Sequence, residues 1–293
     1  MKEKIEDIDF SFGKHSSTSL HKEYEDFLHF HEYIDSLPAD LKRNKGITGR
    51  NRNYENISEL FTSFCSNRGD KGGALFRKGT SADDLLISTW LSFVYEKERI
   101  ISSVSEIPAY NKLEKESLSK LSKYSVDENF PLAAPKLLLS LGIILIYQEA
   151  IPSAKVDGVV YVNEYGNPVI AMSLRYSRLD NYWFTLLHEL SHVVLHYERL
   201  EAPIIEDLDV NDPDNLVESQ ADRLALDSFI PRNLWRGCAV KESLKEDDLF
   251  AFAKEIGIHP AIIAGRVRNE RKSYKYFSKI INAVNFRELV FNV

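Results

Sequence analysis

Apolar residues recur every three or four positions along much of this chain, which is the spacing of an amphipathic helix. In residues 81–101, for example, Leu86, Trp90 and Val94 belong to one wide apolar face. The same spacing predicts helices at 57–65, 81–101, 112–125, 134–141, 184–197, 215–229, 242–258 and 261–279. We therefore expect a mainly helical molecule.

The pattern changes between residues 143 and 175. The segments 143–149, 157–164 and 167–175 are short, rich in Val, Ile and Tyr, and separated by Pro, Asp-Gly and Gly-Asn turn signals. They predict a small sheet of about three strands directly before the helix at 184–197. The fold class expected from the whole pattern is α+β.

Three regions are expected along the chain. Residues 1–125 form a helical N-terminal region of unknown role. Residues 126–240 contain the strands and the two helices that follow them, and form the core. Residues 241–293 form a basic, helical C-terminal cap whose pattern is that of a helix-turn-helix.

Composition narrows the class of protein. The chain has 293 residues, of which 44% are hydrophobic, and a formal net charge of −7. This length suffices for one large domain or two ordinary ones, and the acidic balance argues against a surface that coats nucleic acid. The two cysteines, Cys65 and Cys238, make neither a disulfide framework nor a thiolate metal site, which is consistent with a reducing cytosol.

The sequence shows no pattern expected of a signal peptide or a membrane-spanning helix. The first ten residues mix both charge signs and lack the apolar core of a signal peptide. The longest apolar run, at 131–147, is interrupted by Pro135, Lys136 and Gly142, and is shorter than the ~20 residues of a spanning helix. We expect a cytoplasmic protein without a membrane segment.

The candidate chemistry lies in the helix at 184–197, which contains the pattern H-E-x-x-H as His188, Glu189 and His192. Residues four apart lie one turn above each other on a helix, so both imidazoles can reach one zinc ion. Glu189 lies at the flank of that face and is the expected general base towards a water on the metal. The alternative is a helix with two solvated or hydrogen-bonded histidines.

A third ligand is available on the helix at 215–229. Glu218 lies at the edge of its apolar stripe, so the carboxylate can face the first helix and complete a His, His, Glu set with one position open. Asp222 follows one turn later and can accept the other ring N–H of a ligand histidine. The alternative is an ordinary solvated acidic edge beside Arg223. The residue types favour one Zn²⁺ over magnesium or calcium and leave manganese and iron open.

Three segments carry a resemblance to a known family, namely 168–196, 217–231 and 252–270. They resemble the ImmA/IrrE family of zinc metallopeptidases, especially those joined to HigA-like antitoxin regulators. The likeness runs from about residue 80 to 273 and is strongest over 155–231. The front of the chain departs from the family, because it shows no helix-turn-helix of the kind that many relatives carry.

The resemblance implies a zincin-like core with zinc on His188, His192 and Glu218. It also implies a catalytic role for Glu189, with Asp222 in support. The substrate is then a protein, expected to be a transcriptional repressor or an antitoxin partner.

Two further features of a peptidase site have candidates. By the same resemblance, the strand before the zinc helix receives the substrate as an added strand, at Val169, Ile170, Ala171 and Met172. The alternative is an interior strand with no free edge. An oxyanion needs a hydrogen-bond donor, for which Tyr176 and Tyr182 are candidates, although tyrosines beside a core helix usually serve packing.

The remaining histidines are expected to be structural or exposed. His196 lies eight residues after His188, and the rise of about 12 Å keeps the three histidines of this helix from meeting at one ion. We therefore expect it to have a structural role at the helix end. Solvent-exposed positions are expected for the N-terminal histidines His15, His21, His29 and His31.

The C-terminal helix at 261–279 is a basic island in an acidic protein. As a DNA-reading helix it would use Arg266, Arg268, Arg271 and Lys272. Because the family resemblance covers this segment as a structural cap, the cap is favoured over DNA contact. The basic segment at 41–54 is expected to be a solvated loop.

Two functions compete on this evidence. The first is a zinc-dependent intracellular endopeptidase that cleaves a repressor or an antitoxin partner in stress, phage or toxin-antitoxin regulation. The alternative is a HigA-like antitoxin regulator that binds DNA or a toxin, with a structural or vestigial metal site.

Overall fold

The structure is a computed structural model that describes residues 30–31, 33–35, 37–48, 57, 60–61, 64, 82–201, 203–206 and 216–291. The chain divides into two compact units, Met1–Ser66 and Asn67–Val293. The expected regional boundaries near residues 125 and 240 stay predictions. Of the residues discussed above, His15, His21, His29 and Cys65 lie outside the described ones.

Aromatic rings pack together in the first unit. Phe30 meets Phe61 and Phe64 edge to face, with ring centroids 5.0 and 5.6 Å apart. Tyr33 lies 5.1 Å from Phe64. These rings are buried or half-buried, and they supply much of the described core of this unit.

The predicted basic loop at 41–54 needs a correction. Its first residues belong to helix α2 (Ala39–Asn44), which follows Pro38. Proline has a fixed φ that suits a helix start, and the Lys42 ammonium donates to the carbonyl of Asp35 at 3.0 Å. The loop prediction is therefore wrong for residues 41–44, which are helical despite their loop-like composition.

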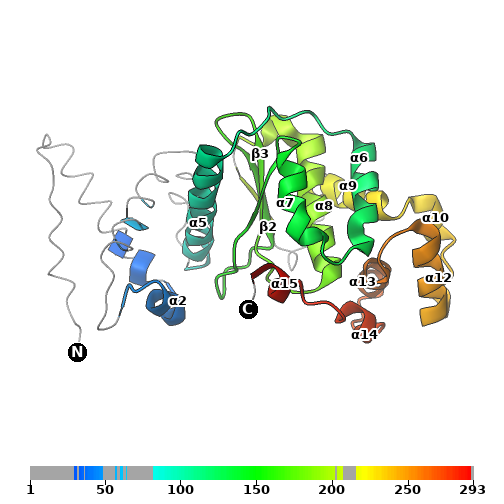
Figure 1. Ribbon diagram of the computed structural model, residues 1–293. Coiled ribbons are helices and arrows are strands. Elements are labelled where there is room, and N and C mark those ends of the chain that lie inside the picture. Colours follow the sequence, from blue (N-terminus) through cyan, green and yellow to red (C-terminus); the bar gives the residue numbers. More distant parts are fainter. Residues whose placement is uncertain are drawn as a thin grey trace, which may run out of the picture. The chain divides into compact units, whose positions relative to one another are not determined.

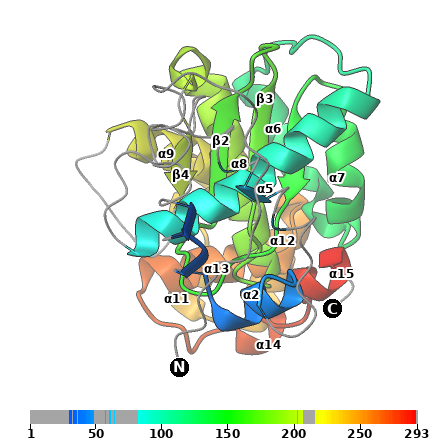
Figure 2. The same cartoon turned by 90° about the vertical axis from the view of Figure 1, so that its left-hand side faces the viewer.

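The second unit has helices on both faces of a four-stranded sheet (Figures 1 and 2). Helix α5 lies on one face, and α7 and α8 lie on the other. The strands are β1 (Ile144–Tyr147), β2 (Gly158–Val162), β3 (Pro168–Met172) and β4 (Ile204–Glu206). The longer helices are α5 (Ala82–Val104), α6 (Lys115–Ser122), α7 (Phe130–Leu139), α8 (Leu179–His196), α9 (Leu216–Phe229), α12 (Glu246–Ile256) and α13 (Pro260–Glu270).

The remaining helices of this unit are short. Two are 3-10 turns, Lys123–Val126 and Tyr197–Arg199, which extend α6 and α8. The others are α10 (Arg232–Arg236), α11 (Val240–Ser243), α14 (Ser278–Ile281) and α15 (Phe286–Phe291). The prediction of a mainly helical α+β fold is confirmed.

The sheet has the order β1-β3-β2-β4. Strands β1 and β3 are parallel, whereas β2 is antiparallel to both β3 and β4. The three predicted strands are present, and β4 is an addition that the pattern did not indicate. A three-residue strand is too short to show the alternation that identifies strands in a sequence.

The core lies between the sheet and α8. Trp183, Leu186, Leu187 and Leu190 of α8 are fully buried, and with Ile170 of β3 they belong to one apolar cluster. Each such side chain stabilises the fold by about 1.5–3 kcal/mol relative to an exposed position. This packing holds α8 rigidly on the sheet and sets which of its faces looks towards α9.

Several helices begin earlier than their apolar patterns indicate. α8 begins at Leu179 instead of residue 184, and α7 begins at Phe130 instead of 134. Pro131 lies in the first turn of α7, where its missing N–H costs nothing. The apolar patterns therefore missed the first turns of both helices, although Phe130, Leu179 and Tyr182 are buried there.

The C-terminal cap is the predicted helix-turn-helix in outline. α12 ends at Gly257, which has a φ of 65°, and α13 starts after His259. α13 stops at Glu270 rather than near residue 279, and Lys272 has a left-handed backbone. Among the residues described, no helix combines the length and apolar character needed to cross a membrane.

Candidate metal centre

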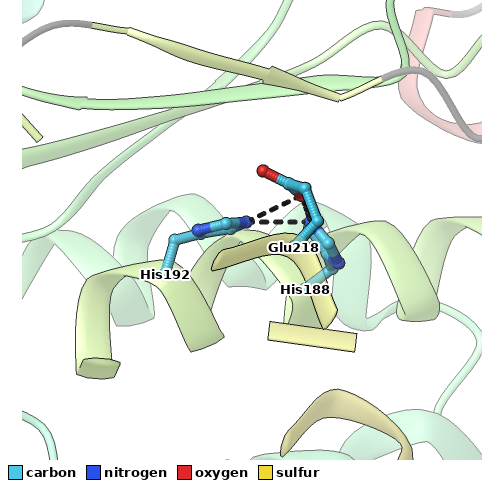
Figure 3. Close-up of side chains that lie close together, drawn as sticks. All are labelled: His188, His192 and Glu218. Carbon is cyan, nitrogen blue, oxygen red and sulfur yellow. Dashed lines mark hydrogen bonds and ion pairs between the residues drawn. The ribbon is translucent and has the colours of Figure 1, made fainter. Parts of the chain in front are cut away.

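Helix α8 brings the two histidines of the H-E-x-x-H pattern together. The Nε2 atoms of His188 and His192 lie 3.0 Å apart, and both rings are buried. Helix α9 supplies Glu218, whose Oε2 lies 3.1 Å from His188 Nε2 and 3.3 Å from His192 Nε2. Figure 3 shows the three side chains pointing toward one another.

Small residues allow α9 to approach α8 this closely. Ala221 and Ala225 are fully buried on the face of α9 that carries the core contacts. Helices pack more closely where the side chains between them are small. The apolar stripe predicted for residues 215–229 thus also sets the distance between the Glu218 carboxylate and the two rings.

The donor atoms fit a cation. Among the residues described, His188, His192 and Glu218 offer ligand atoms that all lie within 4.8 Å of one another. Asp222 Oδ1 lies 2.9 Å from His188 Nδ1, and a carboxylate can only accept, so this ring nitrogen carries the proton. A neutral His188 with its proton on Nδ1 would present the lone pair of Nε2 to a cation held between this ring and the Glu218 carboxylate.

The electrostatics of the cluster agree. Burial lowers the pKa of His192, although Glu218 opposes that shift. Burial by itself raises the pKa of Glu218, but the neighbouring imidazoles of His188 and His192 outweigh it and hold the pKa well below its usual range. A neutral imidazole and an ionised carboxylate are the forms that bind a metal.

Glu189 is held between α8 and the sheet. Its side chain is buried, and a Cβ built on Gly158 of β2 would lie 2.1 Å from Glu189 Oε1. Gly158 is therefore required by the close approach of this carboxylate. The sequence pattern indicated only a turn at Asp157 and Gly158, because proximity to Glu189 arises from tertiary packing.

The predicted substrate strand is wrong. Val169, Ile170 and Ala171 lie in β3, which pairs with β1 on one side and β2 on the other, as does Met172. Both rows of backbone groups are used in the sheet, so β3 has no free edge for an added strand. This is the interior-strand alternative, and the outer strands among the described residues are β1 and β4.

The prediction of Tyr182 as an oxyanion donor is also wrong. Its side chain is fully buried in the core, and its hydroxyl lies 2.8 Å from the hydroxyl of Tyr147. Tyr147 donates in turn to the carbonyl of Pro131 at 2.8 Å. Tyr182 is therefore the donor to Tyr147, and its proton is used inside the core.

Tyr176 packs against Arg175. Its ring is half-buried under the Arg175 guanidinium, whose carbon is 4.9 Å from the ring centroid, and Arg175 forms a two-bonded ion pair with Asp157. Its role as an oxyanion donor stays a prediction.

Two of the four predicted nucleic-acid contacts are used internally. Arg266 donates to the carbonyls of Leu226 and Ile230, and its guanidinium lies 4.4 Å from the Trp235 ring centroid. Arg268 is buried and donates to the carbonyl of Tyr274. The DNA-contact prediction for Arg266 and Arg268 is therefore wrong, because carbonyl groups of the fold bind both guanidinium groups, with Arg268 buried and Arg266 half-buried.

The other two basic residues are exposed. Arg271 donates to the carbonyl of Lys241, and the Lys272 ammonium lies 3.1 Å from Asn269 Oδ1. Both keep solvent contact, and DNA contact through them stays a prediction.

Two residues beside the cluster were not expected to serve the site. His196 is buried, and its Nδ1 lies 3.1 Å from Nδ1 of His192. Its Nε2 lies 3.0 Å from Oε1 of Gln220 on α9. The spacing of four residues from His192 was a signal for this contact, whereas nothing in the sequence singled out Gln220.

Comparison with known proteins agrees with this geometry. Residues 142–267 match the family model described as the IrrE N-terminal-like domain, a peptidase family. The match runs from two residues before β1 into α13, and includes His188, His192 and Glu218. No curated protein matched the chain. Residues 142–267 are therefore similar to the ImmA/IrrE family of metallopeptidases.

Proposed function

We propose that this chain is a zinc-dependent endopeptidase, with zinc bound by His188, His192 and Glu218 and with Glu189 as the general base. The observation that carries the proposal is the convergence of two imidazole nitrogens and one carboxylate oxygen within 4.8 Å. Zinc suits this mixed nitrogen and oxygen set, and three protein ligands leave a position open, as catalytic zinc sites do.

The residues divide the chemistry between them. A zinc ion supplies Lewis acidity, which polarises the substrate carbonyl and makes a water molecule more acidic. Glu189 follows His188 directly on α8 and takes the proton of the attacking water; the same carboxyl then donates a proton to the leaving amine. Asp222 accepts the Nδ1 proton of His188 at 2.9 Å and fixes the orientation of that ring.

The substrate is proposed to be a cytoplasmic protein, namely a transcriptional repressor or an antitoxin partner. The support for this choice is the family alone, and the association with HigA-like regulators has the same basis. The competing proposal of a DNA-binding regulator is weakened, since Arg266 and Arg268 are engaged inside the second unit. The peptidase proposal accounts for more of the described side chains.

The test is Glu189→Gln, which keeps the shape of the side chain and removes its basicity. We expect the variant to keep one zinc per chain and to lose about 10²–10⁴-fold in the rate at which it cleaves a proteome-derived peptide library, read by mass spectrometry. Glu255→Gln, the same change at an exposed position of α12, is the matched control and should cleave normally. Undiminished cleavage by Glu189→Gln, or a wild-type chain that binds no zinc, would refute the proposal.

A further inference from the structure

We infer that His196 and Gln220 are positioning residues, which hold the ring of His192 in the one tautomer that can bind a metal. The inference rests on the proposed metal site and assigns a task to two side chains outside the ligand set. Each of the two ligand histidines needs a hydrogen-bond partner for Nδ1, the ring nitrogen that faces away from the metal position. Asp222 is that partner for His188 only. The hydrogen bonds from His192 to His196 and from His196 to Gln220 have the same role for the ring of His192.

The direction of the hydrogen bonds from His192 through His196 to Gln220 follows from the group that Gln220 presents. Gln220 presents its amide oxygen to His196 Nε2 at 3.0 Å, and an oxygen can only accept, so His196 carries its proton on Nε2. A neutral His196 then has a lone pair on Nδ1, 3.1 Å from Nδ1 of His192. His192 must donate from Nδ1, which leaves the lone pair of its Nε2 facing Glu218 and the metal position.

The reverse direction is incompatible with metal binding. If the Gln220 amide nitrogen faced His196, it would donate to Nε2, and the proton of His196 would move to Nδ1. His192 would then accept at Nδ1 and carry its own proton on Nε2. That proton would occupy the position of the ligand lone pair. Of the two directions, only the first leaves a nitrogen of His192 available to zinc.

Burial makes the two protein partners necessary. His192 is fully buried and His196 is 6% exposed, so bulk water does not reach the contact between the two Nδ1 atoms. The partner at the far end, Gln220, is exposed on α9, two residues after Glu218 and two before Asp222. One turn of α9 therefore supplies a ligand and an outer partner for each ligand histidine, which couples the placement of α9 to the chemistry of both rings.

The test compares His196→Asn with His196→Leu. The two replacements have nearly the same shape, but only asparagine keeps an acceptor near the position of Nδ1. The dissociation constant for Zn²⁺ is measured by competition with a chromophoric chelator. We expect His196→Leu to weaken zinc binding about 10–100-fold and His196→Asn to recover most of that loss. Equal binding by wild type and His196→Leu, or equal losses in the two variants, would overturn the inference.

Gln220 provides a second pair in case the buried replacements impair folding. Gln220→Glu keeps an acceptor for His196 Nε2, and Gln220→Leu removes it at an exposed position. We expect weaker zinc binding only in Gln220→Leu. Unchanged binding there, with both variants folded by circular dichroism, would contradict the proposed role.

A metal-free measurement separates this inference from the peptidase proposal. Nitrogen-15 spectra of the wild-type imidazoles at about pH 8 report which ring nitrogens carry protons. We expect a proton on His192 Nδ1 and on His196 Nε2, and none on His196 Nδ1. A proton on His196 Nδ1 would overturn the inference whatever the metal does. The expected pattern in a chain that binds no zinc would refute the peptidase proposal and leave the hydrogen-bond chain standing.

Discussion

Gly158 is the residue at which the sheet meets the proposed general base. Its missing side chain leaves room for Glu189 Oε1, which would lie 2.1 Å from an added Cβ, and Thr185 Cγ2 would lie 3.0 Å from it. In Gly158→Ala the Glu189 side chain must move, so we expect a large loss of peptidase rate with zinc binding kept within a few-fold. Overpacking should also lower the free energy of unfolding by about 1–3 kcal/mol.

Gly237→Ala is the matched control for this change, since a Cβ added at Gly237 meets nothing within 4 Å. Initial rates, zinc dissociation constants and denaturant unfolding should be measured on both variants. Normal rates in Gly158→Ala would show that the position of Glu189 against β2 has no bearing on the chemistry.

Helix α13 depends on a histidine cap. His259 Nδ1 accepts from the backbone N–H of Ala261 at 3.1 Å, and the backbone N–H of His259 donates to Ser125 Oγ at 3.1 Å. Removing the cap in His259→Ala should lower the free energy of unfolding by about 1 kcal/mol. His259→Asn keeps a side-chain acceptor at the helix start, and chemical denaturation should place it close to wild type at neutral pH.

The same residue predicts a pH dependence. Burial lowers the pKa of His259, while Glu128, 3.5 Å away, opposes that shift without cancelling it. The neutral ring is favoured in the folded chain, so its contribution is present above the unfolded pKa of about 6.5 and is lost as the pH falls through the folded pKa. Between about pH 7 and pH 5, wild type should therefore lose stability relative to His259→Asn. A difference that stays constant over this range would contradict the assignment.

At the level of the whole second unit, the proposed metal site joins two helices that are distant in sequence. α8 supplies His188 and His192, and α9 supplies Glu218. A metal that binds only the folded chain stabilises it by about 2.7 kcal/mol at a free concentration of 100 times the dissociation constant. Calorimetry should therefore show zinc raising the melting temperature of the chelator-treated protein by about 5–10 °C.

His192→Ala is the control for that measurement, and zinc should change its melting temperature little. A rise of equal size in wild type and His192→Ala would place the bound zinc elsewhere. A wild-type melting temperature that does not respond to zinc would remove the proposed link between α8 and α9.

Features carried by local spacing could be predicted. His188 and His192 lie four residues apart within a continuous apolar helix, so one helical turn already places their rings together. The helical placement of Glu218 and Asp222 follows from the apolar stripe on their own helix. The sheet residues likewise show their strand character in runs of Val and Ile.

Features that depend on contacts between distant segments could not be predicted from the sequence. Whether β3 is an outer or an interior strand is decided by where β1 and β2 pair, and a sequence run shows only that the strand is buried. Arg266 and Arg268 look like surface charges in the sequence. In the fold, Arg266 donates to a carbonyl group of α9, and Arg268 donates to the carbonyl of Tyr274, between α13 and α14. The contact of Gly158 with Glu189 joins β2 to α8, and the sequence does not show how close these two elements lie in space.

The amino-acid order alone specified two imidazoles on one helical turn, an acid between them and a carboxylate on a later helix, because these relations depend only on helix geometry. Packing of α8 against the sheet and of α9 against α8 then decided which other groups reach the site: Gly158 against Glu189, and Gln220 through His196 to His192. The physical reason is that side-chain periodicity is local, whereas contacts between elements depend on how buried surfaces fit together.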